Sequence, residues 1–325
     1  MTSVIENGAR NAGLDTLPAH DERYAWAEEF LDVTLKLWER SWDDGALVRD
    51  VESGVFVDTD KIHEIGHQGE QFSVQGPHHV PPSPQRTPVL LQAGGSPVGR
   101  DFAAANAELT FVAASSPEAT AELVADLRAR AKAAGRAPED LKFFAGLSIV
   151  VAKTEEEARR KDARYEESID DEAMLAQISG HLHVDFASVD LDTPLADLST
   201  DGMQGFLKGL KESVPDEKRG QLTFRDLLLG NNLLKRIVGD PHQVADEIQR
   251  WSDAGIDGIG LLELIRPHTF DDFIEFVMPV LQDRGLVQHE YAPGTLREKL
   301  FERGPFLPES HRAHHLPITD KRSTQ

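Results

Sequence analysis

The chain has 325 residues, with 34 lysines and arginines against 56 aspartates and glutamates, a net charge of −22 and no cysteine. The lack of cysteine excludes a disulfide scaffold, an iron–sulfur protein, a thiolate zinc site and a cysteine nucleophile. A chain this acidic is not expected to have the positively charged surface that nucleic-acid binding requires. No run approaches the ~18 apolar residues of a membrane span, and the N-terminus does not resemble a secretory signal. We therefore expect a soluble cytoplasmic protein with neither a nucleic-acid nor a membrane partner.

The N-terminal region predicts a loop followed by a helix. Residues 1–18 are small and polar, whereas apolar residues from His20 to about Trp42 recur at helical spacing. Residues 43–88 then contain two strand-like pieces, at 55–57 and 72–74, before a proline-rich extended stretch. An excursion of this length is usually functional. We therefore expect substrate contacts from it, with its histidines lining the substrate mouth: His63, His67, His78 and His79.

A regular alternation of strands and helices begins near residue 89. Apolar strands that alternate with amphipathic helices indicate βαβ units and a buried parallel sheet. The predicted strands are 89–93, 109–113, 141–152 and 257–262, and the predicted helices are 98–107, 117–134, 154–168, 241–254 and 270–284. Residues 170–238 interrupt the alternation with mixed segments, which we also expect to contact substrate. From 288 to 325 the chain is a polar, proline- and histidine-rich arm.

The predicted fold is α/β, of the (β/α)8 TIM-barrel type, in one domain over residues 1–287 with insertions at 43–88 and 170–238. Four barrel-type strands are too few for a closed barrel, so we expect an incomplete one with the first strands missing. Open sheet edges predict poor solubility or obligate self-association of this chain.

A set of residues spread in order over positions 2–303 carries a family resemblance. Its members are Thr2-Ser3, Ala9-Arg10-Asn11, Gly13, His20-Asp21, Arg23-Tyr24, Trp38, Trp42, His67, Gly69-Glu70, Phe72, Gly76-Pro77, Gln92-Ala93-Gly94, Ser96-Pro97, Gly99-Arg100, Asp257-Gly258, Val280-Leu281-Gln282-Asp283-Arg284-Gly285, Tyr291 and Thr295-Leu296-Arg297. Together they resemble the bacterial-luciferase-like, flavin-dependent monooxygenases, in the branch of nitrilotriacetate monooxygenase component A and dibenzothiophene-sulfone monooxygenase. Members carry a further N-terminal segment with the first barrel strands, so the resemblance implies that this chain corresponds to the C-terminal part.

The resemblance implies a two-component monooxygenase that assembles as a homo-oligomer. Reduced FMN, supplied by a separate NAD(P)H:flavin reductase, would react with O2 and oxygenate a small organic substrate through a flavin peroxide. Sulfone, aminocarboxylate, sulfide and alkane substrates all remain open. Two alternatives are a truncated, non-catalytic homologue that only self-associates and a related barrel enzyme that uses a deazaflavin.

Ser96 is the sharpest candidate for a cofactor-binding residue. Gly95 and Ser96 follow a predicted strand, where barrel active sites lie, and the helix after Pro97 directs its positive end toward them. The family's phosphate-binding serine falls on Ser96, whereas from the residues alone a simple helix N-cap is equally plausible. Arg100, one turn into the helix, would either reach the same phosphate or pair with a surface acid.

Three further residues complete the predicted site. His20 and Tyr24 stand four apart and share a helix face, and the family pattern assigns both to flavin contact. Without the family, a capping histidine and a core tyrosine would be the better interpretation. His20 is also the predicted catalytic residue, since histidine can move a proton near neutrality. Ser3 is a further candidate for flavin contact.

We do not predict a metal site. His63 and His67 have i, i+4 spacing but lie among glycines that disfavour a helix, and the pair His181/His183 lacks a carboxylate partner at suitable spacing. The same holds for the histidines of the arm, at 311, 314 and 315. Phosphate-loop and nucleophile-elbow motifs are also missing from the sequence, Gly205 and Gly209 being only two glycines in a helical stretch.

Overall fold

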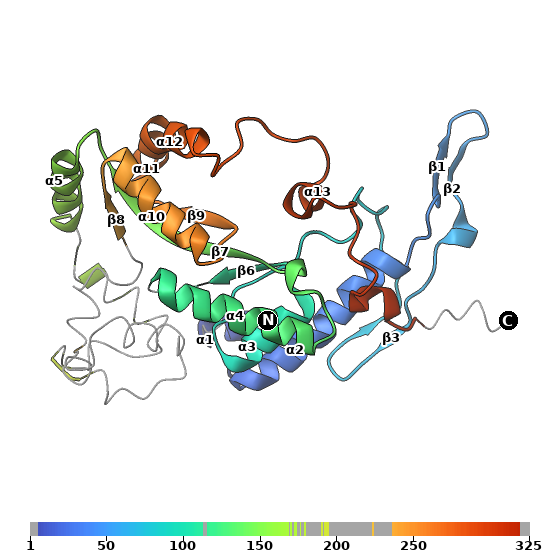
Figure 1. The fold of residues 1–325 in the computed structure, drawn as a ribbon. Coiled ribbons are helices and arrows are strands. Elements are labelled where there is room, and N and C mark those ends of the chain that lie inside the picture. The colour runs from blue at the N-terminus through green and yellow to red at the C-terminus, as the bar shows by residue number, and fades with distance from the viewer. Residues whose placement is uncertain are drawn as a thin grey trace.

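A parallel sheet forms the centre of the computed structural model, which describes residues 6–112, 116–168 and 236–318 and isolated positions between 170 and 223 (Figure 1). Its strands in the described part are β5 (Leu91–Gln92), β6 (Leu109–Val112), β7 (Lys142–Val151), β8 (Arg236–Gly239) and β9 (Gly258–Leu262). The first half of β7 pairs with β6 and β9, and its last four residues pair with β8. These strands do not close on themselves. The predicted α/β class and incomplete barrel are confirmed.

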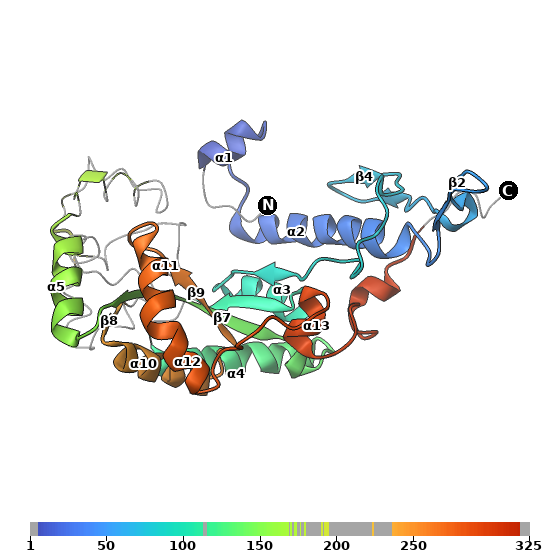
Figure 2. The same cartoon turned by 90° about the horizontal axis from the view of Figure 1, so that it is seen from above.

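Helices cover one face of this sheet and enclose the main core. α3 (Pro97–Asn106), α4 (Pro117–Ala133) and α10 (Pro241–Asp253) pack against it, with α5 (Glu155–Glu166) after β7 (Figure 2). Phe143 and Leu147 of β7 are fully buried with Leu127 of α4 and Trp251 of α10. The alternate residues of β7 face this helix layer because side chains alternate along a strand.

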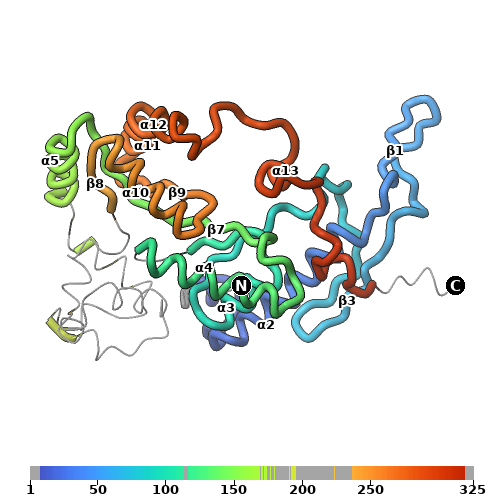
Figure 3. The backbone as a smooth tube through the Cα atoms, in the orientation of Figure 1, coloured from blue at the N-terminus to red at the C-terminus, as the bar shows by residue number. Residues whose placement is uncertain are grey.

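The segment 43–88 lies at the amino end of the sheet. It follows α2 (His20–Leu35) and the π-helical turn η1 (Lys36–Arg40), and it forms two antiparallel hairpins before β5. Its strands are β1 (Leu47–Asp50), β2 (Val55–Val57), β3 (His67–Gln68) and β4 (Ser73–Val74). A connection from a helix to the next strand must reach the amino end of that strand. Helix α5 follows the carboxyl end of β7 and so marks the opposite end of the sheet. Figures 1 to 3 show the hairpins on the side of the molecule away from α5.

This position argues against substrate contacts from residues 43–88, because barrel active sites lie at the carboxyl ends of the strands. Two histidines of the segment are engaged by charged side chains. Nε2 of His63 lies 2.8 Å from a carboxylate oxygen of Asp43. His67 lies between two charged residues: its Nδ1 is 3.1 Å from Nζ of Lys36, and its Nε2 is 3.1 Å from a carboxylate oxygen of Glu29. The expectation of substrate contacts rested on the length of the segment, whereas its position depends on its following a helix rather than a strand.

Three further segments differ from the sequence-based expectation. Residues 6–11 form the short helix α1 (Glu6–Asn11) rather than a loop, with Ala9 buried. The end of the predicted 170–238 insertion supplies strand β8, whose Ile237 joins the core. Apart from isolated positions, the rest of this insertion lies outside the described residues, and so do His181, His183 and Gly205–Gly209. The predicted last helix comprises α11 (His268–Asp272), the π-helical η6 (Phe273–Val277) and α12 (Met278–Asp283).

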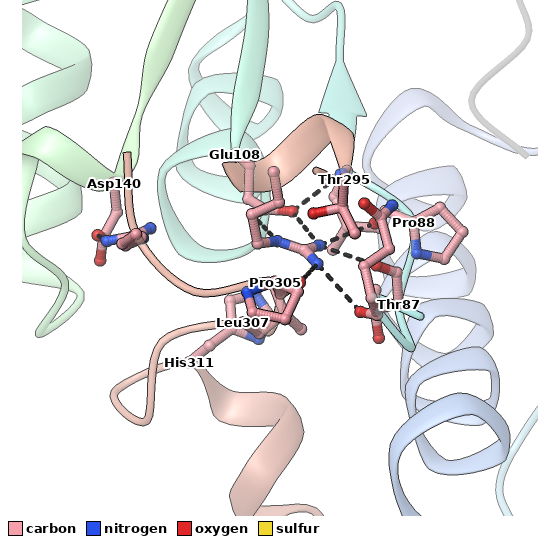
Figure 4. Close-up of polar contacts among 12 residues, drawn as sticks. Thr87, Pro88, Glu108, Asp140, Thr295, Pro305, Leu307 and His311 are labelled. Carbon is pink, nitrogen blue, oxygen red and sulfur yellow. Dashed lines mark hydrogen bonds and ion pairs between the residues drawn. The ribbon is translucent and has the colours of Figure 1, made fainter. Parts of the chain in front are cut away.

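The C-terminal arm packs back onto the chain through a buried arginine. Arg297, in α13 (Leu296–Phe301), is fully buried and forms two bonds of 2.6 and 2.9 Å to the carboxylate of Glu108, just before β6. Its guanidinium also donates to four backbone carbonyl oxygens (Figure 4), those of Gln85, Thr87, Pro88 and Pro305. The arm therefore joins the start of the sheet to the end of the 43–88 segment.

A second contact of the arm is made by His311, which precedes the 3-10 turn η7 (Arg312–His315). The ring of His311 is fully buried, with Nε2 donating to the carbonyl of Asn106 at 3.2 Å and Nδ1 accepting from the backbone N–H of Ala313. Burial, reinforced by the positive charges of Arg136 and Arg312, lowers the pKa of His311 to about 4. The imidazole is therefore neutral in the folded protein at neutral pH.

Candidate functional site

The amino ends of α2 and α3 meet at the carboxyl end of β5. Tyr24, in the second turn of α2, is 93% buried, and its hydroxyl lies above two glycines at the start of α3. A Cβ on Gly94 would stand 2.8 Å from that hydroxyl oxygen, and one on Gly99 would stand 2.5 Å from it. Both positions must lack a side chain for Tyr24 to lie there. Sequence reasoning missed Gly99, although a glycine inside a predicted helix is a sign of close packing.

His20 and Tyr24 share a face of α2, as predicted from their spacing. Their ring centroids are 5.3 Å apart, and the far side of Tyr24 packs on Phe102 of α3 at 5.8 Å. Nδ1 of His20 lies 2.8 Å from a carboxylate oxygen of Asp21. A carboxylate at Nδ1 favours the tautomer that carries its proton there, which leaves Nε2 able to accept a proton.

Ser96 caps α3, with its Oγ accepting from the backbone N–H of Gly99 at 3.2 Å. Capping occupies a lone pair of the hydroxyl and leaves its proton free to donate. The helix-cap interpretation and the phosphate-binding interpretation are therefore compatible at this residue. A Cβ on Gly95 would meet nothing within 4 Å, so the backbone there has open space beside it.

Arg100 pairs with an acid in this structure. Its Nη1 lies 2.9 Å from a carboxylate oxygen of Asp126 on α4, and its Nε donates to the carbonyl of Gly95 at 3.0 Å. The positive charge of Arg100 is thus neutralised, and its side chain braces the turn at Gly95.

The residues brought together here fit the phosphate end of a flavin mononucleotide. The turn at Gly94 and Gly95 lacks side chains, the amino end of α3 presents backbone N–H groups, and the hydroxyls of Ser96 and Tyr24 lie beside it. The structure thus places together four of the five predicted site residues: His20, Tyr24, Gly95 and Ser96. The fifth, Ser3, lies outside the described residues.

Replacing Gly99 by alanine should displace the Tyr24 hydroxyl and so weaken flavin binding at this site. The methyl group would enter the space of the Tyr24 hydroxyl, whereas alanine is the better helix former by about 1 kcal/mol. We expect about a tenfold loss of FMN affinity in a fluorescence titration, together with a lower melting temperature, because the buried ring of Tyr24 must shift. Gly304→Ala, at a position with no atom near the added methyl, is the control. Equal affinities of the Gly99→Ala variant and the parent would contradict the packing role of Gly99.

Neither a metal cluster nor a membrane-spanning helix occurs in the described ranges. No group of three or more histidines, aspartates or glutamates there could hold a metal ion. In the same residues, no helix is both long enough and apolar enough to cross a membrane.

Comparison with known proteins gives consistent matches. The family model for luciferase-like monooxygenases matches residues 2–258. Dimethyl-sulfide monooxygenase of Hyphomicrobium sulfonivorans is 41% identical over 304 residues, 92% of this chain and 63% of that protein. Nitrilotriacetate monooxygenase component A of Aminobacter aminovorans is 36% identical over 305 residues, 92% and 67% of the two chains.

Solved structures agree with these matches. The crystal structure of riboflavin lyase (RcaE) with modified FMN and its substrate riboflavin superposes with a TM-score of 0.86 at 34% identity, covering 97% of this chain and 69% of that one. The chain thus spans about two thirds of the length of the relatives it matches, and slightly less for the dimethyl-sulfide enzyme.

Proposed function

Because the chain belongs to the luciferase-like monooxygenase family, we propose that it is the oxygenase part of a two-component, FMN-dependent monooxygenase. Reduced flavin, delivered by a separate NAD(P)H:flavin reductase, would supply the chemistry that activates O2. The substrate would be a small organic molecule of the sulfone, aminocarboxylate, sulfide or alkane type, and the working assembly a homo-oligomer. The observation that carries the proposal is the seating of Tyr24 over Gly94 and Gly99, beside Ser96 and the amino end of α3.

The chain's own residues have distinct roles in this proposal. Ser96, Tyr24 and the backbone at Gly95 would bind the flavin phosphate, and the positive end of α3 would stabilise its charge. His20, held by Asp21 through Nδ1, would take up or return a proton at Nε2. A relative whose structure contains modified FMN supports the choice of cofactor.

The experiment that tests the proposal is an anaerobic fluorescence titration of reduced FMN into the 325-residue chain and its Ser96→Ala variant. Loss of the hydroxyl removes one hydrogen bond to the phosphate, so we expect a tenfold higher Kd, about 1.4 kcal/mol. Ser116→Ala is the matched control, because Ser116 caps α4 by the same contact, from Oγ to the N–H of Ala119 at 3.2 Å, and also precedes a proline.

Both variants lose a helix cap, about 1 kcal/mol of stability, and we expect similar small falls in melting temperature. Only Ser96→Ala should lose flavin affinity. If neither this chain nor an N-terminally extended form binds reduced FMN, the flavin proposal fails. If a deazaflavin binds in preference, the alternative cofactor is correct. If flavin binds but no oxygenation occurs with the reductase present, the non-catalytic alternative is favoured.

A further inference from the structure

The hairpin of β1 and β2 projects from the body of the molecule as a ribbon of only two strands (Figures 1 and 3). Its apolar side chains are open to solvent: the exposed fractions are 43% for Val48 and Val55, 60% for Phe56 and 93% for Val51. A two-stranded hairpin is marginally stable in water by itself, and apolar side chains gathered on a surface commonly mark an interaction site. A further strand beside this ribbon would stabilise it.

The outer edge of β2, the edge that faces away from β1, is open to such a strand. The backbone N–H of Asp58 donates inward, to the carbonyl of Ala46 just before β1. Because these groups alternate in direction along a strand, the N–H and C=O groups of Val57 and Val55 point outward. In the described part of the chain, the one contact of these outward groups is a long one, 3.4 Å from the N–H of Val55 to Oγ of Ser53.

This edge lacks the features by which edge strands normally avoid pairing. Lysine, proline or another charged residue usually interrupts an exposed edge, whereas β2 consists of Val55, Phe56 and Val57, all of strand-forming types. The net charge of −22 opposes contact between two copies of the chain through their wider surfaces. The strand itself carries no charge, so two copies can approach each other there without opposing like charges.

We propose that β2 pairs with β2 of a second copy of this chain, in antiparallel orientation around a two-fold axis at Phe56. The strand reads the same in both directions, so the axis places Phe56 opposite its counterpart and Val55 opposite Val57 of the second copy. The outward backbone groups of both valines then bond across the axis. The flanking Asp58 falls opposite Gly54 rather than another acid. The two ribbons of two strands become one sheet of four.

This inference rests on the homo-oligomer of the proposed function and identifies a contact that forms it. A contact between two ribbons is smaller than the area of about 1,200–2,000 Å² that a stable complex usually buries. We therefore expect a Kd in the micromolar range for this contact alone.

The lack of cysteine in the chain makes a cross-linking test specific. In the proposed pairing the two Phe56 positions form a non-hydrogen-bonded pair, whose Cα atoms are about 4.5 Å apart, within the range of a disulfide. Phe56→Cys should therefore form a covalent dimer under mild oxidation, about tenfold faster than the control Val51→Cys. The control position is more exposed, but it lies at the hairpin tip, and antiparallel pairing directs the two tips away from each other.

A charge at the axis should weaken the pairing. Phe56→Lys places two like charges opposite each other, and we expect about a tenfold higher Kd of self-association in sedimentation equilibrium. Val51→Lys changes the net charge by the same amount at the hairpin tip and should leave this Kd unchanged. Both positions are exposed, so both variants should keep the melting temperature of the parent when measured below the Kd.

The outcomes separate the pairing from the homo-oligomer as a whole. Equal cross-linking of Phe56→Cys and Val51→Cys, or an unchanged Kd for Phe56→Lys, would overturn the pairing while association through other surfaces stands. A parent chain that stays monomeric and a Phe56→Cys variant that forms no dimer would overturn both. If Phe56→Lys does not fold, the cross-linking comparison decides. Flavin binding, measured with Ser96→Ala, tests the proposed monooxygenase independently of these results.

Discussion

Replacing Arg297 with leucine should lower the free energy of unfolding by about 3–5 kcal/mol. The substitution leaves the carboxylate of Glu108 fully buried without its cation and removes the donor to four backbone carbonyl oxygens. Urea unfolding followed by circular dichroism should show a clearly lower midpoint. The main loss should be seen as detachment of the arm, measured by faster proteolysis after residue 288.

The control for this change is Arg250→Leu on α10. Arg250 also has two acidic partners, Glu118 and Glu247, but its side chain is half exposed. Exposed ion pairs contribute about 0–1 kcal/mol, so that variant should remain near the parent. A double replacement of Arg297 and Glu108 by apolar residues should recover part of the loss, because no buried charge is then left alone. Similar midpoints for Arg297→Leu and Arg250→Leu would show that the buried pair contributes little.

Acid should destabilise the protein in part through His311. The pKa of His311 is about 4 when folded against an ordinary 6.5, so between these values the unfolded chain binds more protons than the folded one. Stability therefore falls as the pH drops below 6.5, and this single group accounts for about 3 kcal/mol by pH 4. Protonation of Nδ1 also removes the acceptor for the Ala313 N–H.

His311→Asn tests this because asparagine retains an acceptor for the Ala313 N–H but does not titrate. We expect the variant to be less stable than the parent at pH 7 and to show a shallower decline in unfolding free energy between pH 7 and pH 4. His268→Asn, at an exposed histidine, should follow the parent at every pH. Parallel curves for the parent and His311→Asn would contradict the low pKa.

The alternating part of the fold could be predicted because its signals are local. Ser96-Pro97 and Ser116-Pro117 mark two helix starts by the residue types that cap a helix and begin it. The shared face of His20 and Tyr24 follows from a spacing of four. Strand β8 was missed because it has only four residues and follows an irregular stretch.

The long-range features could not be predicted from local patterns. Arg297 and Glu108 are 189 positions apart, and nothing in either neighbourhood indicates that they meet. Arg23 lies among Asp21 and Glu22 in a helix start that suggests exposure, so its burial appears only once α2 is packed. The location of residues 43–88 was predictable in principle, from the rule that a helix-to-strand connection reaches the amino end of the strand, but their length and histidine content suggested contact with substrate.

The two ends of this sheet have different roles: the buried contacts of Arg297, which stabilise the fold, lie at one end, and the flavin-binding candidates lie at the other. Substitutions in the loops that follow the strands can therefore alter substrate specificity without weakening the Arg297 contacts that hold the arm. Such a separation helps a fold to evolve new activities, because substitutions that change activity and substitutions that change stability fall at different positions.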